Sequence, residues 1–138
     1  MTAPLEPIQH IPFLRLLGVH QHEVPPGHSH LVLPELKPEH MNSLAAAHGG
    51  VVMTLLDVAM ARAARTAPGR DGGPVVTVEM SSRFLRPGSG PLTARGHVLH
   101  AGRSLCSCQA ELRDAEGRLV ASAAGTFKYW KGATGGVD

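Results

Sequence analysis

The opening third of the chain shows short apolar patterns interrupted by turn residues. Apolar side chains recur at roughly helical spacing between Ile8 and Leu17, and the following Gly18 is a natural helix stop. We therefore predict a helix over residues 8–17, with Pro12 in its first turn, where a missing N–H costs little.

Two strands are expected next. Residues 19–24 and 29–36 lie on either side of the turn sequence Pro25-Pro26-Gly27, which favours a hairpin between them. Because Pro34 cannot donate a ladder hydrogen bond, the second strand is predicted to lie at a sheet edge or to break there.

The longest periodic segment, residues 48–65, is apolar on nearly all sides. A helix without a polar face must be surrounded by other structure, so this one is predicted to lie in the interior of the protein. Several breakers between Ala67 and Pro74 end it.

Everything after that helix has strand character. We predict strands over residues 75–84, 92–100, 105–112 and 119–130, followed by a loose tail over 132–138. One apolar helix and four long strands predict an α+β fold, in which a curved antiparallel sheet wraps around the central helix. The outer face and edges of such a sheet stay unprotected, and a second subunit covers them, so we expect a homo-oligomer.

Composition narrows the class of protein. The 138 residues are 43% hydrophobic and 17% charged, which predicts one globular domain over residues 1–138 with a core over about 8–130. The formal net charge of +2, with scattered arginines, argues against a nucleic-acid binder. We find no signal peptide and no apolar segment long enough to span a bilayer, so we expect a cytoplasmic protein without membrane partners.

The cysteines and histidines do not form a familiar metal site. Cys106 and Cys108 are two residues apart on a predicted strand, so they share one face and are expected to be reduced core residues. The nine histidines suggest a metal, but no cysteine or carboxylate completes a set at a familiar spacing, and we predict none. The histidines closest to such a set are His20, His22, His28 and His30.

Asp57 is the residue that most needs an explanation. It lies in mid-helix between Leu56 and Val58, where aspartate is a weak helix former and a buried carboxylate is costly. One interpretation is a structural acid, paired with an arginine or capping a backbone group. The other is a general base or nucleophile in a dry pocket.

The sequence His48-Gly49-Gly50 opens the same helix. Two glycines allow a ligand to approach the backbone closely, and the first N–H groups of a helix lack internal partners. These donors suit a developing oxyanion, although an ordinary loop-to-helix junction with His48 as a cap fits as well. Asn42, just upstream, is either a turn residue or an amide that holds a water or a carbonyl.

Together these residues resemble a known family. The sequence NSLAAAHGG at residues 42–50, followed by Asp57, is similar to the signature of hotdog-fold acyl-CoA thioesterases of the PaaI type, within the 4-hydroxybenzoyl-CoA thioesterase superfamily. The resemblance extends over roughly residues 13–128 and includes VVTVEM, FLRP and GRS at 75–80, 84–87 and 102–104. Ala45 departs from the pattern, since many members carry glycine there, and we expect a change in loop flexibility rather than in chemistry.

The resemblance implies a role for each matching position. Asp57 matches the catalytic acid, and the Gly49 amide matches the donor that polarises the thioester carbonyl. Asn42 and His48 match residues that orient the carbonyl, the water or the loop. Thr77 falls where relatives carry a hydroxyl that assists the acid or the water.

Binding of the coenzyme needs cations and N–H donors near its phosphates. The candidates are Gly50, Arg83, Arg103 and Ser104, with Arg86 and Lys128 as further cations. Arg103 is preferred because it lies in a turn between Gly102 and Ser104, although a solvated surface role fits each arginine singly.

Helix geometry separates the two halves of the predicted site. Gly49 and Asp57 are eight residues apart, about 12 Å along a helix axis, so one thioester carbon cannot be close to both within a single chain. We therefore predict an active site across a dimer interface, with Asn42 and Gly49 from one subunit and Asp57 and Thr77 from the other. A homodimer is then the catalytic unit, and a homotetramer is expected.

The predicted function is hydrolysis of an acyl-CoA to the free acid and CoA, without a further cofactor, since coenzyme A belongs to the substrate. The resemblance favours aryl or arylacetyl groups. A hotdog dehydratase is disfavoured because its pairing of a histidine with an acid is not found. A non-catalytic acyl-thioester binder or regulator is the alternative from another class.

Overall fold

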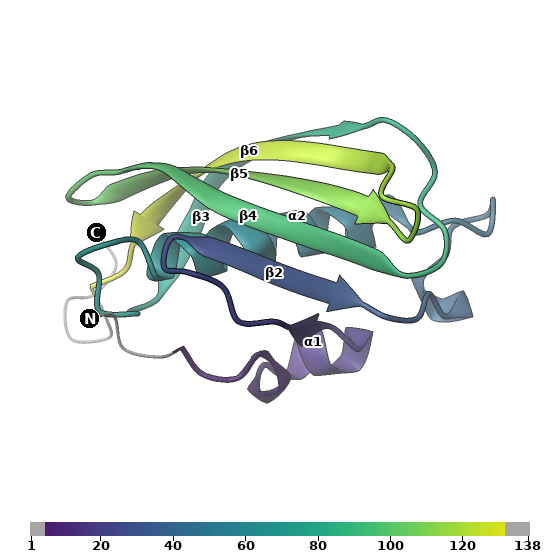
Figure 1. Ribbon diagram of the computed structural model, residues 1–138, viewed down its shortest axis with the longest axis horizontal. Coiled ribbons are helices and arrows are strands. Elements are labelled where there is room, and N and C mark those ends of the chain that lie inside the picture. The colour runs from purple at the N-terminus through teal and green to yellow at the C-terminus, as the bar shows by residue number, and fades with distance from the viewer. Residues whose placement is uncertain (1–4, 132–138) are drawn as a thin grey trace.

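A six-stranded antiparallel sheet curves around one long helix in the computed structural model, which describes residues 5–131 (Figure 1). The strand order is β1-β2-β4-β5-β6-β3. The strands are β1 (His20–Gln21), β2 (His28–Leu33), β3 (Val75–Phe84), β4 (Leu92–Ala101), β5 (Leu105–Asp114) and β6 (Leu119–Tyr129). The helices are α1 (Pro12–Leu17) and α2 (Gly49–Arg65), with 3-10 turns over Ile8–His10 and Pro38–His40. The predicted hotdog architecture is confirmed.

Three predicted elements near the N-terminus are shorter than expected, among them the strand predicted over residues 29–36, which ends at Leu33 directly before Pro34. The helix predicted over residues 8–17 divides at Ile11, whose extended backbone (φ −91°, ψ 111°) is what a following proline favours. The first strand contains only His20–Gln21, which pairs with β2 as the predicted hairpin. Gly18 does end α1, in the left-handed conformation at φ 83°. The predicted tail over 132–138 lies outside the described residues.

The interior lies between α2 and the concave face of the sheet, where α2 packs mainly against β4, β5 and β2. Strand β5 alternates between buried and exposed side chains, and its inward row includes Cys106, Cys108 and Leu112. Both cysteines are buried and free, as predicted. Burial raises the pKa of the Cys108 thiol, so this sulfur stays protonated and is not a nucleophile.

One side of α2 approaches β4 unusually closely at Gly96. A Cβ atom at Gly96 would lie 2.5 Å from the Ala59 carbonyl oxygen, so only glycine fits there. The Ser29 hydroxyl donates to the same oxygen at 2.6 Å and accepts from the Gly96 N–H at 3.2 Å. We call this the closed side of α2.

The opposite side of α2 is not covered by the described part of the chain, contrary to the expectation of a fully enclosed helix. Gly50 and Met53 are exposed, Met53 by 42%, and Asp57 on the next turn is half-buried. These positions follow helical spacing and form a stripe beside β3, which we call the open side. The sheet is too narrow to enclose the helix completely.

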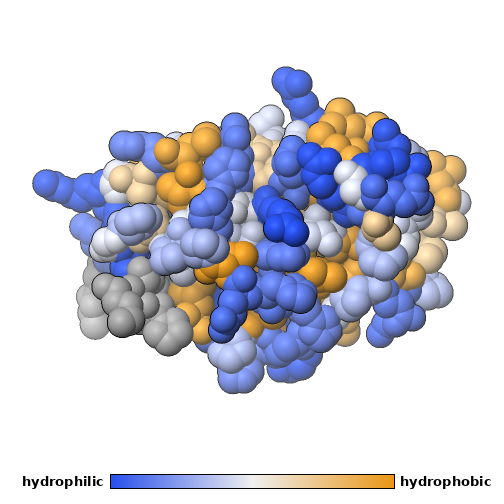
Figure 2. All heavy atoms as spheres, in the orientation of Figure 1, coloured by the Kyte–Doolittle hydropathy of each residue, from blue (hydrophilic) through white to orange (hydrophobic). Residues whose placement is uncertain are grey.

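Strand β3 is the long edge of the sheet and borders this open side. Most of its residues are exposed, and Val76, Val78 and Phe84 show 41%, 55% and 53% of their surface. An apolar edge strand of this length is a template for pairing with another chain. On the convex face of the sheet, Figure 2 shows hydrophilic residues over much of the surface, with separate hydrophobic patches between them, including one near the β3–β4 connection.

Candidate active site

The start of α2 is a capped helix N-terminus with one donor left over. His48 is the N-cap, and its Nδ1 accepts the Gly50 N–H at 2.9 Å. Within residues 5–131 the Gly49 N–H has no hydrogen-bond partner. His48 therefore acts as a cap, one of the two roles left open for it, and its ring orients the turn that presents the Gly49 amide.

Asn42 builds the loop that precedes this turn. Its Oδ1 accepts the N–H groups of Leu44 at 2.8 Å and Ala46 at 3.2 Å. The acceptor half of the side chain is thus used within the loop, while its NH₂ group has no partner among the described residues. Ala45, where the family resemblance led us to expect glycine, adopts a left-handed conformation (φ 59°). Asn42 can offer a ligand only its donor half.

A groove of about 390 Å³ joins these two donors. Asn42 and Gly49 line it together with Leu44, Val52, Phe84 and Val120, and the segment 85–88 completes its wall. The Phe84 ring lies next to the helix start, since a Cβ atom at Gly49 would be 3.9 Å from it. We call this the α2 groove; it combines hydrogen-bond donors with a mainly apolar lining.

Asp57 and Thr77 form a second, separate pair. The Thr77 hydroxyl donates to Asp57 Oδ1 at 2.7 Å, joining the middle of α2 to the start of β3. No arginine, lysine or histidine of the described chain forms an ion pair with Asp57. Among residues 5–131, Asp57 is therefore not a structural acid neutralised by a cation. The second carboxylate oxygen is left for a substrate or a water.

The structure keeps the two predicted halves of the site apart. Asn42 and Gly49 belong to the α2 groove, while Asp57 and Thr77 lie two turns further along α2, about 12 Å from Gly49 along the axis. Both halves border the open side of the helix. Neither half alone combines a free N–H donor with a carboxylate.

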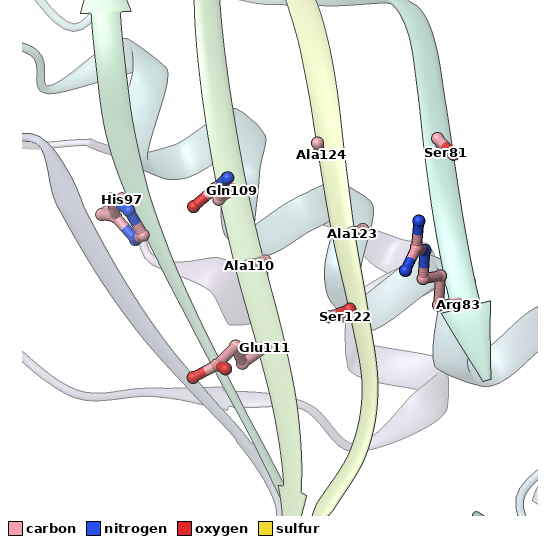
Figure 3. Close-up of a pocket in the computed structure, with 9 residues that line it drawn as sticks. All are labelled: Ser81, Arg83, His97, Gln109, Ala110, Glu111, Ser122, Ala123 and Ala124. Atoms are coloured by element: carbon pink, nitrogen blue, oxygen red, sulfur yellow. The ribbon is translucent and has the colours of Figure 1, made fainter. Parts of the chain in front are cut away.

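The predicted coenzyme-binding residues are dispersed over the single chain. Gly50 lies at the start of α2, while Arg83 lies on β3 at the convex face. Figure 3 shows Arg83 and Ser81 on one side of a shallow hollow, with His97, Gln109 and Glu111 on the other. Arg86 lines the α2 groove.

Arg103 and Ser104 share a different hollow, of about 350 Å³, with Lys131 and Trp130. Arg70 fixes the turn beside it, because its Nη2 donates to the carbonyls of Gly102 and, at 2.8 Å, Arg103, while its guanidinium stacks 3.4 Å above the Tyr129 ring. The turn that bears the exposed Arg103 side chain is thereby held at the end of the sheet where β3 begins. Sequence reasoning missed Arg70, Trp130 and Lys131, which are far from Arg103 along the chain.

The walls of the α2 groove were also missed, although a signal was present. Met80, Ser82 and Phe84 alternate on β3 with Ser81 and Arg83, which lie on the convex face. That alternation places Phe84 on the helix side, but which part of α2 it meets depends on the sheet curvature.

Two further observations concern metals and membranes. Within the described residues, no three His, Cys, Asp or Glu side chains gather in a way that suits a metal ion. The rings of His22 and His30 stack at 4.7 Å between centroids, and those of His28 and His97 are 6.4 Å apart. No helix within residues 5–131 has the length and apolar character needed to cross a bilayer.

Comparisons with known proteins agree with this architecture. Residues 44–121 match the family model described as the thioesterase superfamily, which is more than half of the chain. A protein of Halobacterium salinarum with a provisional esterase name is 30% identical over 127 residues, covering 86% of this chain and 84% of its own length. A similarly named protein of Saccharolobus solfataricus is 37% identical over 81 residues, but the match spans only 58% of this chain and 56% of that protein.

Solved structures give the same result. A conserved protein from Pseudomonas aeruginosa superposes with a TM-score of 0.83 at 27% identity, covering 92% of this chain and all of that one (100%). A mutant of the phenylacetic acid degradation protein PaaI from Thermus thermophilus gives a TM-score of 0.76 at 30% identity, covering 86% and 99%. This chain therefore belongs to the thioesterase superfamily, as a hotdog-fold protein of the PaaI type, and that membership supports thioester hydrolase activity.

Proposed function

We propose that this protein hydrolyses an acyl-CoA thioester to the free acid and CoA. The observation that carries the proposal is that one helix presents two reactive groups. The Gly49 N–H lies in a mainly apolar groove without a hydrogen-bond partner among the described residues, and the Asp57 carboxylate has no cation beside it. The first group suits a developing oxyanion and the second suits a general base or nucleophile.

Four groups and one water molecule are enough for the proposed reaction. The Gly49 N–H and the Asn42 NH₂ polarise the carbonyl, while Thr77 holds the Asp57 carboxylate. As a base, Asp57 takes a proton from water, the water oxygen bonds to the carbonyl carbon, the C–S bond breaks, and the proton passes to the departing sulfur. As a nucleophile, Asp57 bonds to the carbonyl carbon, the C–S bond breaks and CoA leaves as its thiolate. Water then hydrolyses the mixed anhydride to the free acid and the Asp57 carboxylate, and the proton released passes to the thiolate; Asp57 can act by either route.

A homodimer brings the two halves together in this proposal. The open side of α2 and the apolar β3 edge are continuous surfaces that a second copy related by two-fold symmetry would cover. Asn42 and Gly49 of one protomer would then face Asp57 and Thr77 of the other. The tetramer and the cytoplasmic location stay predictions.

The Arg103 hollow is our candidate for the coenzyme phosphates. Arg103, Lys131 and Arg70 supply positive charge that outnumbers the single carboxylate of Asp71, while Ser104 supplies a hydroxyl and Trp130 an aromatic surface. Since this hollow includes Pro74, three residues before Thr77, it lies at the Asp57 half of the shared site. Arg83 and Gly50 remain weaker candidates because they lie elsewhere.

Release of free thiol from a panel of aryl- and alkyl-CoA thioesters tests the function. Asp57→Asn is expected to lower kcat by about 10²–10⁴-fold, the usual contribution of a general base. Equal rates for the variant and the wild type would remove Asp57 from the mechanism. Tight binding of the panel without turnover by the wild type would favour the non-catalytic alternative.

Mixed dimers test the shared site separately. A heterodimer of one Asp57→Asn chain and one Asn42→Ala chain contains one intact site and one doubly damaged site, so it should recover about half of the wild-type activity. Purified heterodimers, verified by two different affinity tags, are required. If they are as inactive as the parent homodimers, the two halves do not come from different chains.

A further inference from the structure

The α2 groove has more room than a carbonyl needs. Its whole volume, with the two donors among the lining groups, is about 390 Å³, within the usual range for a small-molecule pocket. Most of the wall is apolar, with Leu44, Val52, Phe84 and Val120, while Arg86 contributes the one charged side chain. Something larger than an oxygen atom fits there.

A thioester carbonyl carries two substituents, and only one of them suits this lining. The first acyl carbon and the CoA sulfur are both bonded to the carbonyl carbon, so a carbonyl oxygen bound to the Gly49 N–H brings both of them to the groove, and the lining decides which one enters it. Of the two substituents, the CoA arm bears phosphates that need cations. Arg103 and Lys131 both line the Arg103 hollow, at the end of the sheet near Thr77, whereas the groove beside Gly49 has Arg86 alone.

We propose that the α2 groove binds the acyl group of the substrate, as an uncharged apolar chain or ring, and that Phe84 limits its size. This inference rests on the proposed function and its shared site. The CoA arm then approaches from the partner protomer, past the partner's Asp57, while the acyl group enters the groove of the protomer that supplies Gly49.

Phe84 is placed to act on acyl size. Its ring is the neighbour nearest to Gly49 on the groove side, so it flanks the point where the acyl group starts. In the isolated chain 53% of its surface is exposed, so removing the ring opens space without leaving a hole in the core. A smaller residue there widens the groove at its entrance.

A chain-length series tests the proposal. We would measure kcat/KM for acetyl-, butyryl-, octanoyl-, lauroyl-, benzoyl- and phenylacetyl-CoA with wild type, Phe84→Ala and Phe84→Leu. Phe84→Ala is expected to shift the ratio of long-chain to benzoyl kcat/KM by at least about tenfold, with Phe84→Leu between it and the wild type. Inhibition by free CoA, which lacks an acyl group, should not change.

Phe13→Ala is the matched control. Phe13 is a phenylalanine on α1 with 55% of its surface exposed, almost equal to Phe84, and it is not part of the groove. Its removal should leave the substrate profile unchanged. Thermal unfolding and light scattering establish that every variant is folded and has the wild-type oligomeric state.

The possible outcomes distinguish failure of the acyl-binding proposal from failure of the proposed hydrolase function. A uniform change across all acyl groups, or weaker inhibition by free CoA, would show that the CoA arm occupies the groove and would overturn the proposal. An unchanged profile in both folded Phe84 variants would overturn it as well, while thiol release by the wild type would keep the proposed function standing. If the wild type hydrolyses none of the series, the proposed function fails first.

Discussion

On one side of α2, Gly96 brings the backbone of β4 within contact of Ala59, and Ser29 ties both together by hydrogen bonds. On the other side, the same helix leaves Met53 exposed and Asp57 half-buried, and the described chain supplies nothing to cover them. The closed side has no space for one methyl group, whereas the open side has space for a ligand and for a second chain.

This difference separates stability from activity along a single helix. Close packing on the closed side leaves little freedom for substitution, as in any well-packed interior. The unsatisfied donor at Gly49 and the unpaired carboxylate at Asp57 both border the open side, where packing is incomplete. Groups that a stable interior would pair are available there for chemistry.

Adding the same methyl group on each side gives the largest contrast. Gly96→Ala places a carbon against the Ala59 carbonyl and should lower the free energy of unfolding by about 3 kcal/mol or more. In Gly49→Ala the new Cβ atom would lie 3.9 Å from the Phe84 ring, its nearest neighbour. The free energy of unfolding should then change by less than about 1 kcal/mol. Urea unfolding measures both, and similar midpoints for the two variants would contradict the comparison.

Removing one N–H on the open side should affect rate rather than fold. Gly49 is the first residue of α2, where proline is accepted, and His48 (φ −59°, ψ 141°) already has the conformation that precedes a proline. Gly49→Pro deletes the proposed carbonyl donor and should lower kcat on the order of 10²-fold. Gly49→Ala, which keeps the N–H, serves as the reference. Equal kcat values for the two variants would exclude this amide as the donor.

A charge on the open side should separate the protomers. Met53→Glu leaves the isolated chain intact because Met53 is already 42% exposed, but it puts an unpaired carboxylate into the proposed interface. The dimer dissociation constant should rise by about tenfold or more, and specific activity should fall with it. Sedimentation at several protein concentrations provides the measurement. Leu16→Glu, on exposed α1, should leave assembly unchanged, and an equally stable Met53→Glu dimer would place the interface elsewhere.

The smallest effect is expected in the loop that leads to the open side. Ala45 adopts a left-handed conformation that strains any residue with a Cβ atom. Ala45→Gly should therefore raise the free energy of unfolding by about 1 kcal/mol at most, a few degrees in Tm. Ser43→Gly, in the same loop but without a positive φ, should not stabilise. A lower Tm for Ala45→Gly than for the wild type would contradict the claim that Ala45 is strained.

Much of the architecture could be predicted because side-chain periodicity reflects local geometry. The apolar run of α2 and the alternation in β5 identify their elements without knowledge of the fold. The helix predicted over residues 8–17 was wrong at Ile11, where the effect of Pro12 on its neighbour outweighed the apolar spacing. The interior position of α2 was only half right, since hydrophobicity does not say whether the covering residues belong to the same chain.

The candidate site was less accessible from sequence alone. Asp57 could be singled out as a costly residue in an apolar helix, but its partner Thr77 is twenty residues away on another element. Only the resemblance indicated Thr77 beforehand. The loop role of Asn42 depends on hydrogen bonds to Leu44 and Ala46, which composition and spacing do not specify.

The uncovered β3 edge has a kinetic consequence if each site is completed by a second chain. Free protomers then contribute no turnover, so the rate per chain depends on total protein concentration. Well below the dissociation constant, velocity should rise with the square of the amount of protein, and above it in simple proportion. Dilution would act as a reversible off-switch, and the cellular abundance of this protein would set its specific activity as well as its total activity.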